Sequence, residues 1–164
     1  MVSGKAAGLR ILCRIVLTSA VTLPAGAAAP KQAFVTWDSL EVDKCASIWL
    51  IKRLIAPDAQ ILFYQREEEP PQGIQFDTPE AEFRRYHNRS TYETLLQHYQ
   101  LNDKNLIHIG RIIHDIEVNT WQRKALDETP RIEFEVKQII LDRQPQSTVK
   151  VCLEYFDKLL SRYR

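Results

Sequence analysis

One segment decides the fold: Val42-Asp43-Lys44-Cys45-Ala46-Ser47-Ile48-Trp49-Leu50-Ile51-Lys52-Arg53-Leu54-Ile55-Ala56-Pro57-Asp58-Ala59. Its apolar residues recur at helical spacing from about Asp43 and form a broad face, which predicts a helix packed in the interior. Pro57 ends this helix, because proline cannot continue it. We expect Trp49 to be buried and Lys52 and Arg53 to be partly exposed.

Two β-prone runs flank this helix. Ala33–Trp37 precedes it and Gln60–Tyr64 follows it. A strand, a helix and a strand of these lengths form a βαβ unit with parallel strands and a right-handed crossover. Gly73–Asp77 is compatible with a further short strand.

The rest of the chain has helical patterns. Ser90-Thr91-Tyr92-Glu93 is a capping box that opens a helix ending near Tyr99. Asn102 is expected to cap a second helix, in which apolar residues recur at helical spacing up to Ile116. Thr129-Pro130 begins a third helix, and the last runs from about Ser147. The prediction is an α+β fold, in which a small βαβ unit precedes a mostly helical C-terminal half.

Length and composition exclude several classes of protein. The chain has 164 residues and a formal net charge of +1, which suits one domain and argues against a pervasively basic nucleic-acid surface. Beyond residue 27 only Gly73 and Gly110 remain. Phosphate-cradling loops need several glycines close together, so no nucleotide cofactor is expected. The same absence argues against a reductase that carries its own electron donor.

The first 27 residues have the pattern of a secretory signal. Lys5, Arg10 and Arg14 precede the apolar run Ile15–Leu23, and Ala25-Gly26-Ala27 is a small-residue cleavage site. The run is far shorter than the ~20 residues that span a bilayer. We therefore expect a periplasmic or secreted protein that begins near Ala28, consists of one domain over residues 28–164 and has no membrane span after cleavage. An N-terminal anchor or tail is the alternative.

Cys45 and Cys152 would both lie in the exported chain. A disulfide between them would stabilise the fold by roughly 4–5 kcal/mol in the chain-entropy picture. Because each lies on the apolar face of a predicted helix, two buried thiols are the simpler alternative.

Residues His114-Asp115-Ile116-Glu117 carry the clearest chemical signal. His114 and Glu117 are three residues apart and therefore share a helix face. With Asp115, His87 and Glu93 they form a candidate site for a divalent ion such as zinc, iron or manganese. The capping box alone also explains Glu93, and a helix C-terminus favours a histidine without any ligand. His98 and His108 have no acidic partner at a useful spacing and are predicted to be surface or packing residues.

Several blocks of the sequence resemble a known family. Residues 42–59 are similar to the signature V-D-R-x-A-x-x-W-L-I-x-R-F-I-D-P-x-A, which opens the chromate-resistance protein family. This domain also forms the C-terminal part of chromate-sensing regulators. Phe76-Asp77-Thr78-Pro79, His87, Thr91–Leu96 and Ile112–Glu117 resemble its later blocks, in the same order. The chain departs from the pattern at Lys44, where the family has arginine, and at Glu117, where it has aspartate.

The resemblance implies a link to chromate, a tetrahedral dianion. Recognition of such an anion requires charge-assisted donors, for which arginine is well suited. The candidate oxyanion-binding residues are Lys44, Arg53, Arg84, Arg85 and Arg89. A solvated cationic face is the alternative explanation for them.

Three functions remain open from the sequence. The first is an exported family member that binds a metal ion or an oxyanion as its small inorganic partner. The second is a metal-dependent phosphohydrolase that uses His87, His114 and Asp115, with Glu117 or Glu93 as base or ligand. The third is a non-catalytic interaction module.

Overall fold

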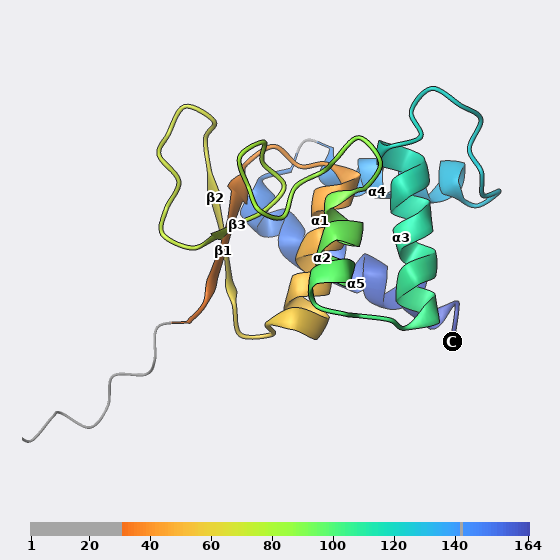
Figure 1. The fold of residues 1–164 in the computed structure, drawn as a ribbon, viewed down its shortest axis with the longest axis horizontal. Coiled ribbons are helices and arrows are strands. Elements are labelled where there is room, and N and C mark those ends of the chain that lie inside the picture. The colour runs from red at the N-terminus through yellow and green to blue at the C-terminus, as the bar shows by residue number, and fades with distance from the viewer. Residues whose placement is uncertain (1–30, 142) are drawn as a thin grey trace, which may run out of the picture.

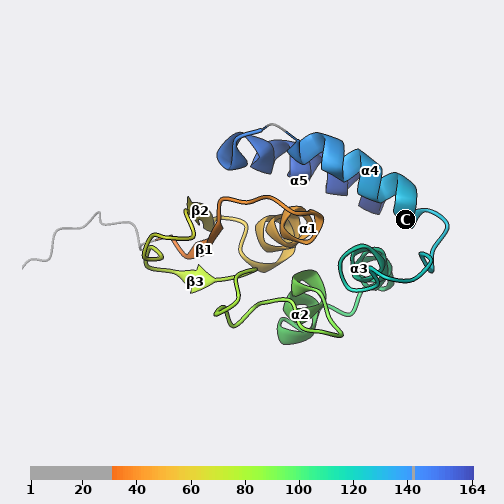
Figure 2. The same ribbon diagram turned by 90° about the horizontal axis from the view of Figure 1, so that it is seen from above.

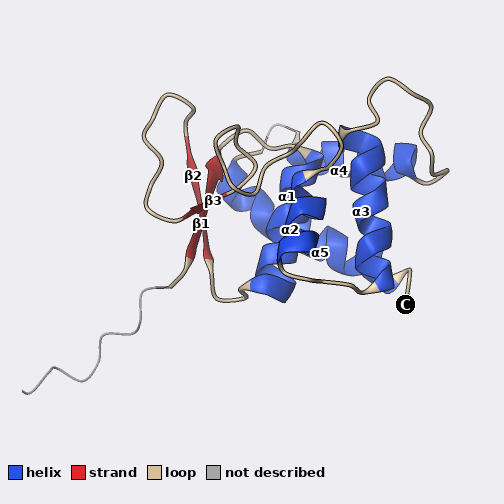
Figure 3. Cartoon of the chain, viewed as in Figure 1, coloured by secondary structure: helices blue, strands red, loops and turns tan. Residues whose placement is uncertain are grey.

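The computed structural model describes residues 31–141 and 143–164, so the predicted signal peptide lies outside the described residues. The strands are β1 (Ala33–Trp37), β2 (Gln60–Tyr64) and β3 (Ile74–Gln75). The α-helices are α1 (Val42–Leu50), α2 (Thr91–His98), α3 (Lys104–Glu117), α4 (Thr129–Ile140) and α5 (Pro145–Ser161), and a π-helical turn, η1 (Ile51–Ile55), continues α1. Figure 3 shows the strands at one end of the molecule and the helices over the rest.

The three strands form a parallel sheet in the order β2-β1-β3. Val35 in the central strand lies opposite Leu62 of β2 and Gln75 of β3. Both the βαβ unit and the α+β class are therefore confirmed. β2 pairs with one edge of β1, and the loop that follows β2 carries the chain past β1 so that β3 pairs with its other edge. The direction in which the chain moves across the sheet therefore reverses at β1.

Helix α1 occupies the centre of the molecule. Figure 2 shows it between a layer formed by α4 and α5 and a second layer formed by α2 and α3. Every residue of Val42–Leu50 is buried as a consequence, and the apolar ones join the main hydrophobic core. Enclosure on all sides also buries three polar residues of this helix, Asp43, Lys44 and Ser47. Their side chains must find partners inside the protein.

Two links attach α1 to α5. Cys45 and Cys152 form a disulfide with their Cα atoms 5.6 Å apart, so the bonded alternative holds in this structure. Trp49 is 1% exposed, and its Nε1 donates a hydrogen bond to Asp157 Oδ1 at 2.9 Å. Asp157 also accepts from Arg53, which is exposed as expected.

Three predicted boundaries differ from the observed ones. The helix that begins at Val42 changes to π-helical geometry after Leu50 and ends at Ile55, where backbone N–H groups bond five residues back. Asp103, not Asn102, caps α3, because its carboxylate accepts from two backbone N–H groups of the first turn. The last helix starts at Pro145, since proline suits the first helical turn.

Among residues 31–141 and 143–164, no helix combines the length and the hydrophobicity needed to cross a membrane.

Trp49 is predicted to be a main source of stability. We expect Trp49→Ala to lower the free energy of unfolding by about 3–5 kcal/mol, because it removes a buried indole from the core. Trp121 is 97% exposed and is the matched control. Chemical denaturation of both variants makes the comparison, and an equal, small effect of the two substitutions would contradict the central packing of α1.

Candidate functional site

The parallel sheet brings three segments of the chain to one edge. The carboxyl ends of β1, β2 and β3 lie on the same side of the molecule, and the loops that follow them gather there with the beginning of α1 (Figure 1). Trp37 ends β1, Arg66 follows β2, and Asp77 follows β3. In open parallel sheets, ligands bind at this edge, beside the strand where the direction of the connections reverses.

A pocket of about 470 Å³ opens at this edge, and we call it the strand-end pocket. It is lined by Trp37, Ser39, Glu41, Lys44, Arg66, Asp77, Thr78, Pro79, Arg84 and Arg85. Four of these residues carry cationic side chains and two carry carboxylates. The pocket is therefore polar and has an excess of positive groups.

Lys44 forms the floor of the strand-end pocket. Its ammonium group donates to the carbonyl oxygens of Trp37 at 3.0 Å and Ser39 at 2.5 Å, and lies 3.7 Å from Asp77 Oδ2. Burial lowers the pKa of Lys44, whereas the nearby Asp77 carboxylate opposes this shift. These contacts attach the start of α1 to the end of β1.

Asp43 makes the corresponding attachment on the opposite side of α1. Its carboxylate accepts from the backbone N–H groups of Thr91 at 2.6 Å and Tyr92 at 2.8 Å, in the first turn of α2. Ser47 Oγ donates to the same carboxylate at 3.3 Å. Burial and the charge of Asp77 raise the pKa of Asp43 to about 8, against the opposing effect of the two amide donors.

Asp77 and Arg85 complete the charged network. Asp77 has a positive φ of 52° and accepts from Thr91 Oγ1 at 2.7 Å. Burial raises the pKa of Asp77 despite the nearby Lys44.

Arg85 pairs with Glu41 at 2.5 Å and with Glu117 at 3.1 Å. Burial likewise raises the pKa of Glu117, although Arg85 opposes the shift.

Some donors in the strand-end pocket have no protein partner. Arg85 Nε and Thr78 Oγ1 are buried and form no hydrogen bond with any described residue. Arg66 lies over the Trp37 ring, 4.5 Å from its centre, and pairs with no carboxylate in the described part of the chain. Arg84 donates from one nitrogen to backbone carbonyls and lies over Tyr86. Hydrogen-bonding capacity therefore remains available to a ligand.

Three of the five predicted oxyanion-binding residues meet in this pocket: Lys44, Arg84 and Arg85. Arg53 is instead paired with Asp157, and Arg89 donates to Gln97 on the outside of α2. Arg66 was not among the predicted residues. Its position directly after a parallel strand next to β1 is the signal that could have identified it.

The predicted metal ligands do not all meet at one point, and most of them contact other residues. Glu93 Oε2 accepts from the backbone of Ser90 at 2.8 Å, as the capping box predicted, and also lies 2.9 Å from His114 Nδ1. Glu117 is paired with Arg85, and His87 is exposed at the tip of the turn Tyr86–Arg89. Within the described residues, no three His, Cys, Asp or Glu side chains form a group able to hold a metal ion. The metal site stays a prediction.

Asp115 has a structural environment of its own. It is 2% exposed, and it accepts hydrogen bonds from Asn119 Nδ2 at 2.7 Å and from the backbone N–H groups of Ala125 and Leu126 at 2.9 and 3.2 Å. Burial alone would raise the pKa of Asp115, but these donors hold it below its ordinary value. Asp115 thus fixes the loop between α3 and α4.

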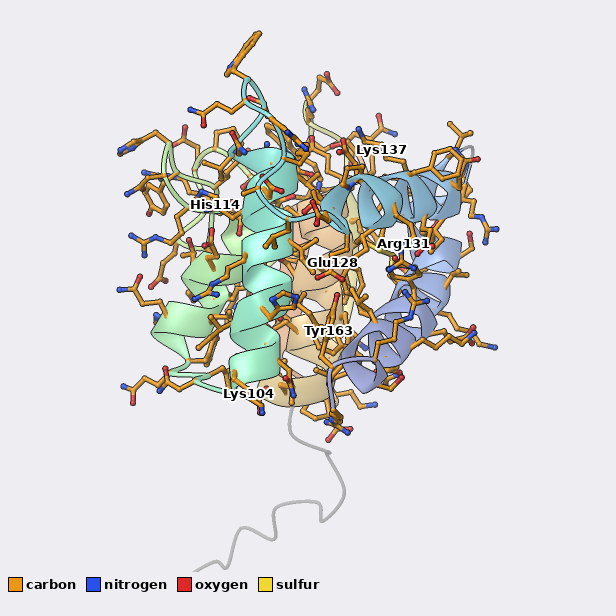
Figure 4. The ribbon with its side chains drawn as sticks, turned by 90° about the vertical axis from the view of Figure 1, so that its right-hand side faces the viewer. Lys104, His114, Glu128, Arg131, Lys137 and Tyr163 are labelled. Atoms are coloured by element: carbon orange, nitrogen blue, oxygen red, sulfur yellow. A yellow bond between two sulfur atoms is a disulfide. The ribbon has the colours of Figure 1, made fainter. Side chains whose placement is uncertain are left out.

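His108 packs edge-to-face against Tyr163, as expected of a packing residue, and it also has an acidic partner that is distant in the sequence. Its Nε2 lies 2.7 Å from Glu128 Oε1, and Tyr163 Oη donates to the other oxygen of the same carboxylate at 2.7 Å. His108 lies in α3, Glu128 immediately before α4 and Tyr163 in the turn after α5. Figure 4 shows Glu128 and Tyr163 on one side of α3 and His114 on the other. The partners are twenty or more residues apart, so no short spacing in the sequence signals them.

Comparison with known proteins decides the family. The model of the family described as "ChrB, C-terminal domain" matches residues 34–163. The chain belongs to this chromate-resistance family. It is 34% identical over 87 residues to Protein ChrB of Cupriavidus metallidurans, and the match covers 52% of this chain but only 27% of that protein. No solved structure matches.

The family match includes both the strand-end pocket and α3. It extends through α4 and α5, where the sequence motifs alone gave little resemblance. The ChrB C-terminal domain therefore includes the disulfide partner Cys152 and the Glu128 network in this chain.

Asp115→Asn should destabilise the protein by about 2–3 kcal/mol at neutral pH, because hydrogen bonds to a charged acceptor are lost. The pKa of Asp115 is depressed in the folded state, so its stabilising effect is present above pH 3.8 and is lost as the pH falls through the folded value. The difference in unfolding free energy between wild type and variant should therefore shrink at low pH. Urea denaturation at pH 7 and near pH 3 measures it.

Asp127 is exposed in the same loop, so Asp127→Asn is the control. If Asp115→Asn and Asp127→Asn had the same stability at neutral pH, Asp115 would not hold the loop.

Proposed function

We propose that this chain is an exported member of the ChrB C-terminal family that binds a tetrahedral oxyanion of the chromate class in the strand-end pocket. The observation that carries the proposal is the convergence of three arginines, Arg66, Arg84 and Arg85, at the carboxyl ends of parallel strands. Membership of the chromate-resistance family makes chromate the first candidate for the anion.

The charge of the pocket supports a dianion. Four cationic side chains face two carboxylates, Glu41 and Asp77, in the pocket lining. The ammonium group of Lys44 already donates to the carbonyl groups of Trp37 and Ser39 and lies beside Asp77. It therefore supplies positive charge to the pocket but no free hydrogen-bond donor. Arg66, Arg84 and the Nε of Arg85 are the groups left to contact the ligand, because the other two nitrogens of Arg85 are paired with Glu41 and Glu117. Guanidinium groups present paired donors to oxyanions.

The donors without protein partners support the same interpretation. A buried polar atom that lacks a hydrogen bond costs about 1–3 kcal/mol, so proteins seldom leave one unless a ligand or water satisfies it. Arg85 Nε and Thr78 Oγ1 are two such atoms in one pocket. An anion with four oxygen atoms accepts from several directions at once, which suits a pocket whose donors come from the loop after β2, with Arg66, and from the loop after β3, with Thr78 and Arg85.

Binding of chromate by the purified protein tests the proposal. Calorimetry at low ionic strength should show saturable binding of chromate, competition by sulfate, which is also a tetrahedral dianion, and weaker competition by the planar monoanion nitrate. Arg66→Gln and Arg84→Gln should each weaken binding about tenfold or more, because each removes a charge-assisted contact. Both side chains lie at the surface of the pocket, so their loss should leave the fold intact.

Arg53→Gln is the matched control, since Arg53 pairs with Asp157 away from the pocket. Chromate affinity that is unchanged in the Arg66→Gln, Arg84→Gln double variant, or that is lost in Arg53→Gln, would overturn the assignment to the strand-end pocket.

Export is the second part of the proposal. It rests on the signal-like pattern in residues 1–27, and it is supported by the disulfide Cys45–Cys152, because structural disulfides persist mainly in oxidising compartments. In that location the protein would meet the anion outside the cytoplasm.

Intact-mass measurement of periplasmic material tests this part. The mass should correspond to a chain that begins near Ala28 with one disulfide formed. Recovery of the uncleaved chain in the cytoplasm with both thiols reduced would contradict export.

A further inference from the structure

A second pocket lies on the other side of the helical layer formed by α2 and α3, and we call it the α3 pocket. It has a volume of about 610 Å³, within the range of small-molecule sites. Its lining consists of Glu93, Arg111, His114, Asp115, Val118, Asn119, Gln122, Ala125 and Leu126. None of these residues lines the strand-end pocket.

The charged side chains in this lining differ in whether they have partners within the protein. The Glu93 carboxylate accepts from Ser90 and contacts His114, and the Asp115 carboxylate accepts from three donors of its own loop. The guanidinium of Arg111, by contrast, forms no hydrogen bond or ion pair with any residue in the described ranges. The charge left available to a ligand is therefore positive.

His114 offers a second polar contact beside Arg111. The two residues are one turn apart on α3 and line the same pocket. The Nδ1 atom of His114 is held by Glu93 at 2.9 Å, which fixes the orientation of the imidazole ring. Because Nδ1–H donates to Glu93, the Nε2 atom is an acceptor, and it has no partner among the described residues. The side-chain amide of Gln122 lies in the same lining.

The rest of the wall is apolar. Val118, Ala125 and Leu126 contribute hydrocarbon surface from the segment that connects α3 and α4. Asp115 holds Ala125 and Leu126 in place through their backbone N–H groups, so this wall is preformed. A wall of this kind favours a ligand with an apolar body and excludes a fully hydrated inorganic ion as the best occupant.

We propose that the α3 pocket is a binding site for a small organic carboxylate. The carboxylate pairs with Arg111 and accepts a hydrogen bond from the side-chain amide of Gln122, and the apolar body lies against Val118 and Leu126. Arginine binds a planar carboxylate through two parallel hydrogen bonds, which an exposed, unpaired guanidinium permits. This site is independent of oxyanion binding at the strand-end pocket.

Titration of the isotopically labelled, disulfide-bonded protein with benzoate tests the proposal by NMR. Benzoate should produce saturable shifts of the Gln122 side-chain amide and the Leu126 backbone amide. Benzamide has the same ring without the charge and should bind at least tenfold more weakly. Arg111→Gln should weaken benzoate binding about tenfold or more.

Arg131→Gln is the matched control, because Arg131 is an exposed arginine on α4 that pairs with Glu135. It should bind benzoate as wild type does. The Arg111 variant is preferred to one at His114, since His114 also connects α3 to α2.

The proposal is overturned if benzoate gives no saturable shift, if benzamide binds equally well, or if Arg111→Gln retains full affinity. Displacement of benzoate from these amides by equimolar sulfate would also overturn it, because the apolar body would then contribute nothing.

Discussion

The buried Asp43 carboxylate is the contact on which the rest of the structure depends. It accepts the first backbone N–H groups of α2 and thereby joins the beginnings of two helices that are far apart in the sequence. Lys44, the next residue, binds the carbonyl groups at the end of β1. Two adjacent buried polar residues thus fix α1 to the sheet on one side and to α2 on the other. A polar group without such partners would be costly to bury in this position.

The attachment of α1 at its beginning also positions the strand-end pocket. Because α1 is fixed at its beginning, the loops after the three strands are held around that point, and their arginines face a common pocket. The far end of α1 is fastened differently, by the disulfide to α5 and by the Trp49–Asp157 hydrogen bond. Both ends of α1 are therefore fixed, the beginning by hydrogen bonds of Asp43 and Lys44 and the end by the links to α5.

Sequence patterns predicted the elements of this fold better than their mutual contacts. The βαβ unit, the capping box and the burial of Trp49 followed from periodicity and local chemistry, which act over a few residues. Arg85 was predicted within a cationic cluster, but its pairing with both Glu41 and Glu117 depends on tertiary packing. The Glu128 contacts with His108 and Tyr163 join three helices and have no local signature. Helical spacing placed His114 and Glu117 on one face, yet each has a different partner.

Anomalous diffraction at the chromium absorption edge, from crystals soaked in chromate, would locate the tetrahedral oxyanion that we propose to bind at the carboxyl ends of the parallel strands. We expect one strong peak in the strand-end pocket, within hydrogen-bonding distance of Arg66, Arg84 or Arg85. A peak elsewhere on the protein, with that pocket empty at saturating chromate, would contradict the proposal.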